Sequence, residues 1–188
     1  MTKRRNALII VLLIIGVIAF CFVQFGVKAK IRQQQQAYQV AQLNPLTNDF
    51  ESIVKFKNPY MGNNSNDGNL NANLPLANVP HTFVIDPQTR ELDIRYTETV
   101  QDIGLAKVQS SLVYNATANF ALIDNLDSMK FEFPGTSYHV TREQVQSWYG
   151  VAPATLANQT AWKQNVQSKL ANPQYVKNTF KAFFGGGS

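Results

Sequence analysis

The chain is poor in the residues from which disulfides and metal sites are built. Among its 188 residues there is one cysteine, Cys21, and there are two histidines, His81 and His139. One thiol excludes an internal disulfide and a cysteine-based zinc site, because each needs at least two. The histidines are far apart and neither lies in a His-Glu-x-x-His pattern, so the common zinc-hydrolase motif is missing. We therefore expect no metal and no cofactor.

Acidic residues are missing from the beginning of the chain. All 12 lie beyond Arg32, whereas six of the 17 lysines and arginines lie within the first 32 residues. The rest of the chain carries 11 basic residues against 12 acidic ones, a net charge of −1. A nearly neutral domain lacks the basic surface that nucleic-acid binding requires, so no nucleic acid is expected as a partner.

No charged residue occurs between Ala7 and Val27, and these 21 residues are almost entirely apolar. At about 1.5 Å of helix rise per residue they reach about 31 Å, the thickness of the hydrocarbon core of a bilayer. A cleavable signal peptide has a shorter apolar region of about 7–15 residues followed by small residues, which Val27-Lys28-Ala29 does not match. We therefore predict that residues 1–27 form a cytoplasmic stub and a signal anchor that stays in the lipid bilayer through residues 7–27.

The basic residues on the two sides of this run nearly balance each other. Lys3, Arg4 and Arg5 precede it, and Lys28, Lys30 and Arg32 follow it. The positive-inside rule gives close to a tie, which the free amino terminus tips toward the cytoplasm. The expected location is the cell membrane, single-pass, with the main domain extracytoplasmic. Cys21 follows the bulky Phe20, which disfavours lipidation and favours an apolar cysteine facing lipid.

Beyond a polar stalk at residues 28–45, the apolar pattern predicts one α+β domain at residues 46–150. Asn48 and Glu51 have the spacing of a helix capping box. The asparagine-rich segment from Gly62 to Gly68 is predicted to be an ordered loop, because Asn and Gly tolerate left-handed backbone geometry.

Two β-hairpins flank a long helix in the predicted domain. Residues 82–86 are a strand candidate, and residues 91–97 after the turn alternate apolar and polar side chains. Residues 130–133 alternate again, and residues 138–140 pair back with them after Pro134-Gly135. Between them, residues 105–123 show an apolar stripe at helical spacing that includes Leu105. These elements predict an antiparallel sheet of about four strands packed against helices.

The C-terminal part is predicted to be helical. Thr141 and Gln144 form a second capping-box pattern, and Gly150 ends that helix. A helical extension follows at residues 151–184, with one helix around 156–170 and another after Asn172-Pro173. Residues 185–188, Gly-Gly-Gly-Ser, are expected to be a flexible linker or a tag.

Several short motifs occur together in the domain: Asp49-Phe50-Glu51-Ser52-Ile53, Pro59-Tyr60-Met61-Gly62-Asn63-Asn64-Ser65, Gly68-Asn69-Leu70, Phe120-Ala121-Leu122-Ile123-Asp124-Asn125, Tyr138-His139-Val140-Thr141-Arg142-Glu143 and Trp148-Tyr149-Gly150. They resemble a bacterial family catalogued as domain of unknown function 4825, over about residues 48–150. Its members look like membrane-anchored extracytoplasmic domains of Gram-positive bacteria, and similar domains occur attached to membrane sensor metallopeptidases and anti-sigma-like proteins. The family has no established activity, so the resemblance implies a place at the Gram-positive cell envelope and a sensing role, but no reaction.

The predicted loop is the candidate surface for a ligand or a partner, because ordered loops on rigid scaffolds often bind. The candidate residues are Tyr60, Gly62, Asn63, Asn64, Ser65, Gly68 and Asn69. A calcium loop is the less favoured interpretation, because Leu74 stands where the bidentate glutamate would be needed. We expect a loop that is hydrogen-bonded to itself.

Two functions from different classes remain. The favoured one is a non-catalytic module that binds an envelope ligand or a partner membrane protein, with the C-terminal apolar helix as a second contact. The alternative is a small cell-envelope hydrolase, for which Ser137, His139 and Asp124 would have to assemble in space without a nucleophile elbow. Trp148 and Tyr149 are expected in the core, with a binding platform as the alternative. We expect that the protein is not an enzyme.

Overall fold

The computed structural model describes residues 2–185 and divides the chain into two compact units, Met1–Val40 and Ala41–Ser188. Residues 186–188, most of the predicted linker or tag, lie outside the described residues.

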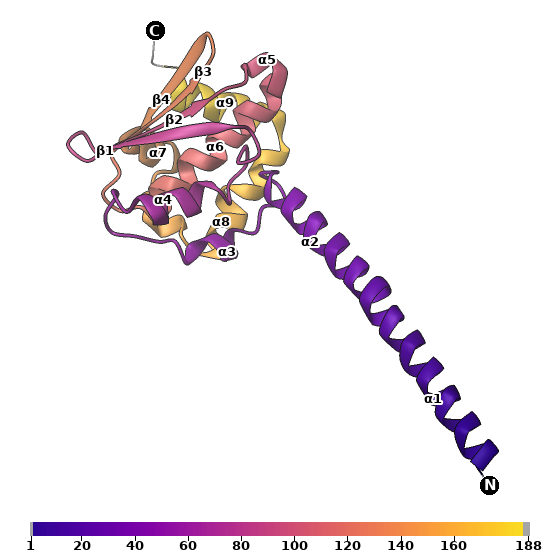
Figure 1. Ribbon diagram of the computed structural model, residues 1–188. Coiled ribbons are helices and arrows are strands. Elements are labelled where there is room, and N and C mark those ends of the chain that lie inside the picture. The colour runs from indigo at the N-terminus through magenta and orange to yellow at the C-terminus, as the bar shows by residue number, and fades with distance from the viewer. Residues whose placement is uncertain (1, 186–188) are drawn as a thin grey trace. The chain divides into compact units, whose positions relative to one another are not determined.

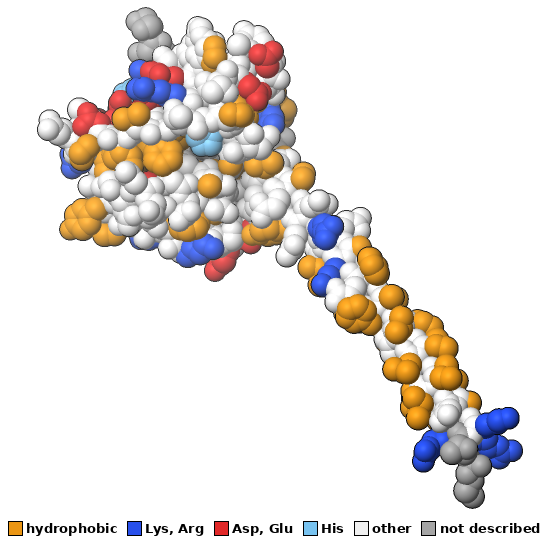
Figure 2. Space-filling model, in the orientation of Figure 1, with side chains coloured by type: hydrophobic (Ala, Val, Ile, Leu, Met, Phe, Trp, Pro, Cys, Tyr) orange, Lys and Arg blue, Asp and Glu red, His pale blue; other side chains and the backbone are white. Residues whose placement is uncertain are grey.

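The described residues of the first unit are helical. They lie in α1 (Thr2–Cys21), the π-helical segment η1 (Phe22–Val27) and α2 (Lys28–Gln42), which ends two residues beyond the unit. Among the described residues one helix, Lys3–Gln42, is long and apolar enough to cross a membrane, and its apolar window buries nothing against the rest of the chain. Figure 2 shows this apolar stretch as orange side chains between two groups of blue ones. The predicted apolar helix is confirmed, and the polar stalk continues it as far as Gln42.

The second unit is built around one four-stranded sheet in the order β1-β2-β3-β4. The strands are β1 (His81–Asp86), β2 (Glu91–Tyr96), β3 (Ser128–Phe133) and β4 (Thr136–Thr141). Both predicted hairpins are confirmed, because β1 pairs with β2 and β3 with β4 in antiparallel fashion. The central pair β2–β3 is parallel, so the sheet is mixed and mostly antiparallel. A parallel pair needs a crossover connection, and here α5 (Val100–Ile103) and α6 (Leu105–Leu122) provide it.

Helix α6 is the central element of the core. Every residue from 111 to 122 is buried, whereas a helix that merely covers a sheet has one apolar stripe. Figure 1 shows the strands as one layer with α6, α7 and α9 on one side of it, and α6 also contacts the C-terminal segments. The predicted stripe is correct from Val108 onward, but Leu105 is 54% exposed, because it lies at the first turn before the helix enters the core.

The capping box predicted at Asn48 is wrong. The helix α3 (Phe50–Val54) begins one residue later, after Asp49. The side chain of Asn48 is buried and is occupied elsewhere: its Nδ2 donates to the carbonyl oxygens of Gln42 and Asn73 at 2.7 and 2.9 Å. Its Oδ1 accepts a hydrogen bond from the Tyr114 hydroxyl at 2.8 Å. A buried amide must be satisfied, and here distant partners take precedence over the local cap.

The capping box at Thr141 is confirmed and opens α7 (Arg142–Tyr149). The backbone N–H of Gln144 donates to the Thr141 hydroxyl, and the backbone N–H of Thr141 donates to the Gln144 side chain. Gly150 ends the helix with a φ of 70°, the left-handed conformation that glycine adopts without strain.

The C-terminal extension forms shorter helices than predicted. The expected helix around residues 156–170 is three pieces: η2 (Pro153–Leu156), α8 (Gln159–Asn165) and η3 (Gln167–Ala171). Asn158 caps α8, so the backbone starts a new helix there instead of continuing one. Helix α9 (Pro173–Phe184) follows Asn172 as predicted. These segments add buried side chains to the same core: Leu156, Trp162, Val166, Leu170, Val176, Phe183 and Phe184.

Candidate functional site

The candidate surface at residues 60–69 is a helix start rather than a loop. Helix α4 (Asn64–Asn71) occupies the second half of the segment that was predicted to be irregular. Asn63 is its N-cap, because the Asn63 Oδ1 accepts a hydrogen bond from the backbone N–H of Asn66 at 3.2 Å. Gly62 turns the chain just before the helix with a φ of 106°, a conformation that favours glycine. The predicted left-handed geometry is therefore present at one position only, and the asparagines serve as a cap and as helix residues.

Long-range hydrogen bonds fix this segment on the domain. The Asn66 Nδ2 donates to the Phe56 carbonyl at 2.7 Å, and the backbone N–H of Met61 donates to the Asn125 side chain. One turn farther along α4, Asn71 forms a reciprocal pair of amide hydrogen bonds with the buried Asn119 of α6, at 3.1 and 3.0 Å. The 60–69 segment is thus held rigidly although it has few apolar side chains.

Asp67 lies at the base of the same turn with only 1% of its surface exposed. Its Oδ2 accepts a hydrogen bond from the backbone N–H of Gly62 at 3.1 Å, whereas its Oδ1 is buried without a hydrogen-bond partner among the described residues. Burial raises the pKa of the Asp67 carboxyl above its usual range, and the Gly62 N–H opposes that shift. This carboxylate is bonded to its own turn, as expected for a self-hydrogen-bonded segment.

The candidate residues divide into an exposed set and a structural set. The side chain of Tyr60 is 71% exposed, and Asn64, Ser65 and Asn69 are exposed as well. Gly68 instead faces the core, because a Cβ atom there would lie 3.1 Å from the ring of Phe83. A ligand approaching this surface would therefore meet one large aromatic ring and several small polar groups.

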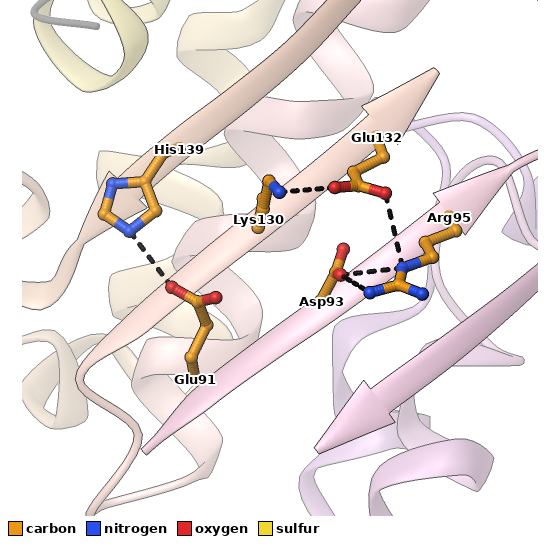
Figure 3. A network of polar contacts seen from close by, with 6 residues as sticks. All are labelled: Glu91, Asp93, Arg95, Lys130, Glu132 and His139. Carbon is orange, nitrogen blue, oxygen red and sulfur yellow. Dashed lines mark hydrogen bonds and ion pairs between the residues drawn. The ribbon is translucent and has the colours of Figure 1, made fainter. Parts of the chain in front are cut away.

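A second polar surface, on the open face of the sheet, was not recognised from the sequence. Figure 3 shows side chains of β2, β3 and β4 arranged in rows across this face. Arg95 bridges Asp93 and Glu132, with its Nε 2.8 Å from Asp93 Oδ2 and 3.3 Å from Glu132 Oε2. Lys130 pairs with Glu132 on the next position of the same face and holds the pKa of that carboxyl below its usual value. The sequence does show charged residues at alternate positions of β2 and of β3, but the pairing of these two strands could not be predicted from it.

His139 belongs to this surface, and its geometry bears on the hydrolase alternative. Its Nε2 lies 3.2 Å from Glu91 Oε2, and the Ser128 hydroxyl donates to the same oxygen at 3.0 Å. Nucleophilic catalysis by serine requires the hydroxyl to contact the imidazole. Within residues 2–185, no hydrogen bond or ion pair joins His139 to Ser137 or Asp124, the other two residues of the hydrolase alternative. Among residues 2–185, no group of three or more His, Cys, Asp or Glu side chains is arranged to hold a metal ion.

The comparisons with known proteins give one match. Residues 53–143 match the family described as Domain of unknown function (DUF4825), which includes the 60–69 segment, α6 and the whole sheet. The matched region ends at the first turn of α7, so the C-terminal helices lie beyond it. No curated protein and no solved structure matches the chain.

Proposed function

We propose that the protein is a single-pass, membrane-anchored extracytoplasmic module. In this proposal it binds an envelope ligand or a partner membrane protein and catalyses no reaction. The DUF4825 match names a domain of unknown function, so the proposal rests on the geometry of the chain. The observation that carries this proposal is the helix Lys3–Gln42, whose apolar window is unburied. Each large apolar side chain moved from water into an apolar phase contributes about 1.5–3 kcal/mol, so a lipid bilayer is the favoured surrounding. Basic side chains at both ends of the window suit the head groups of anionic lipids.

The binding part of the proposal rests on the 60–69 segment. It presents Tyr60, Asn64, Ser65 and Asn69 to solvent from a backbone that hydrogen bonds hold in place. A preorganised surface loses little conformational entropy when it binds, and tyrosine combines a large apolar ring with a hydroxyl. A shallow polar surface of this kind is suited to recognition.

The topology is tested by cysteine labelling in intact cells. The second unit contains no cysteine, so Cys21→Ala removes the only thiol and Ser168→Cys places a new one on the exposed side of η3. We expect a membrane-impermeant maleimide to label Ser168→Cys on intact cells and to label the matched variant Asn6→Cys only after lysis. Labelling of Asn6→Cys alone, or recovery of the protein in the soluble fraction, would refute the proposal.

The binding surface is tested by photo-crosslinking in the full-length protein. A benzophenone amino acid at Asn64 should give a discrete membrane-associated product, and Tyr60→Ala should abolish it. The same probe at the exposed Leu105 is the control and should not give that product. An identical product from both positions would show that the 60–69 segment is not the surface, and turnover of purified wall fragments by the protein would show that it is an enzyme.

A further inference from the structure

The C-terminal helices form a cleft whose lining residues lie beyond the family match and outside the 60–69 segment. It has a volume of about 250 Å³. It is lined by Trp148 and Tyr149 of α7, Leu156 of η2, Asn165 of α8, Lys169 of η3 and Tyr175 of α9. Ligand pockets for drug-sized molecules have about 300–1,000 Å³, so this cleft is suited to one ring of a small or repeating ligand.

The aromatic walls of the cleft are held in place. The indole Nε1 of Trp148 donates to the Tyr175 hydroxyl at 3.2 Å, and the centroids of the two rings are 5.8 Å apart at an angle of 60°. The ring of Tyr149 packs edge-on against Phe183, and its hydroxyl lies 3.4 Å from that of Thr117. As expected, Trp148 and Tyr149 pack against the core, but each is only partly buried. Fixed, partly exposed aromatic faces are available to a ligand.

Lys169 is the one charged residue among those that line the cleft, and its Nζ lies 5.9 Å from the centroid of the Tyr175 ring. The segment that supplies the lining, residues 144–188, contains four lysines and no acidic residue, and Glu143 stands directly before it. The Nδ2 of Asn165 donates to the Ala161 carbonyl, so its Oδ1 is the atom that can accept a hydrogen bond from a ligand. A negatively charged ligand with hydroxyl groups would match both features.

We propose that this cleft binds a sugar ring that carries a negative charge, as one unit of an acidic polysaccharide. The C–H face of a pyranose ring is apolar and packs on aromatic rings, while its hydroxyl edge forms hydrogen bonds. Trp148 and Tyr175 supply the faces, Asn165 supplies an acceptor, and Lys169 pairs with the negative group. An acidic peptide offers the charge but no rigid ring face that packs on the exposed side of the paired aromatic rings. An oligosaccharide with acidic groups therefore fits the cleft better.

The proposal is tested with the full-length protein in nanodiscs of uncharged phosphatidylcholine. Three probes of similar length separate the contributions: a galacturonic acid tetramer, the neutral galactose tetramer and tetraglutamate. We expect a saturable change in tryptophan fluorescence with the acidic sugar, at an affinity at least tenfold higher than with the other two. Equal binding of the neutral sugar or of the peptide, or no saturable change, would overturn the proposal. The measurement is independent of the side of the membrane on which the domain lies, so its outcome is separate from the topology experiment.

Variants place the ligand in the cleft. Lys169→Gln should weaken binding about tenfold, since a charge-assisted contact is lost, and about 1.4 kcal/mol corresponds to each factor of ten. The matched control is Lys163→Gln, which removes an exposed lysine of the same basic segment that does not line the cleft, and it should change the affinity less than twofold. Trp148→Phe should remove the fluorescence change, because the other tryptophan, Trp162, is fully buried. An equal loss in both lysine variants would show general charge attraction and refute the site, and an unchanged melting temperature in each variant excludes unfolding as the cause.

Discussion

Replacement of Arg142 is expected to destabilise the domain far more than replacement of a residue in an exposed ion pair. The guanidinium of Arg142 donates to three backbone carbonyl oxygens, those of Leu126, Phe120 and Ile123, at 2.7, 2.9 and 2.6 Å. Two of these lie at the end of α6, where the last carbonyl groups of a helix have no partner within it. The three residues that carry the carbonyls are fully buried, so water can replace the arginine only in part.

The magnitude follows from the hydrogen bonds that are lost. A hydrogen bond from a charged donor contributes about 1.5–3 kcal/mol, and contributions from one side chain are less than additive. Arg142 itself is only half-buried, so part of the loss is recovered by solvent. We therefore expect Arg142→Leu to lower the free energy of unfolding by roughly 3–4 kcal/mol, and Arg142→Lys by about half of that. For a chain of this size 1 kcal/mol corresponds to about 2–4 °C, so the melting temperature should fall by roughly 10 °C.

The assay is thermal unfolding of the full-length protein in nanodiscs, followed by near-ultraviolet circular dichroism. Arg90→Leu is the matched control, because Arg90 forms an exposed ion pair with Asp127. Exposed pairs contribute about 0–1 kcal/mol, so this variant should melt within a few degrees of the wild type. If Arg142→Leu were as stable as Arg90→Leu, the carbonyl groups at the end of α6 would not need the arginine, and the reasoning would be refuted.

Three further predictions concern the core and one turn. Burial raises the pKa of the Asp67 carboxyl, so its contribution to the free energy of unfolding is lost as pH rises from about 4 through the native pKa. Asp67→Asn should therefore gain stability relative to the wild type from pH 4 to pH 7 in urea unfolding at each pH, and a constant difference between the two proteins would contradict this. Tyr114→Phe leaves the Asn48 Oδ1 and the Trp162 Nε1 without their shared partner and should lower the free energy of unfolding by about 2–3 kcal/mol. A loss below about 1 kcal/mol in the same assay would show that water replaces the hydroxyl. Gly150→Ala forces a φ of 70° on a residue with a Cβ atom and should cost about 1–2 kcal/mol, and an unchanged melting temperature would contradict the strain argument.

The elements that the sequence predicts well have their signals close together in the chain. The hairpin of β1 and β2 follows from alternation over a few residues and a short turn, and the start of α7 follows from two residues three positions apart. The apolar helix is defined by 21 consecutive residues. In each case the signal that predicts the element lies within one short segment.

Features that depend on distant contacts were not predictable from those patterns. The parallel pairing of β2 with β3 joins two hairpins on either side of α6, and nothing in either hairpin specifies its neighbour. Asn48 has the sequence context of a cap, but its partner Tyr114 is 66 positions away. Likewise the helix α4 forms in an asparagine-rich segment of low helix propensity, because Asn66 and Asn71 bond to Phe56 and Asn119. Tertiary hydrogen bonds override the local preference in all of these places.

The motif that makes the family recognisable consists largely of residues that build the scaffold. Gly62 turns the chain, Asn63 caps α4, Gly68 lies against Phe83 and Leu70 is fully buried. A ligand cannot reach the buried Leu70, and Gly68 offers no side chain for recognition, so a match to this motif specifies the fold more directly than it specifies a ligand. Specificity must then come from groups that the scaffold leaves exposed. These are the exposed side chains of the 60–69 segment, the charged face of the sheet and the aromatic cleft beyond residue 143, where two chains with the same fold are free to differ.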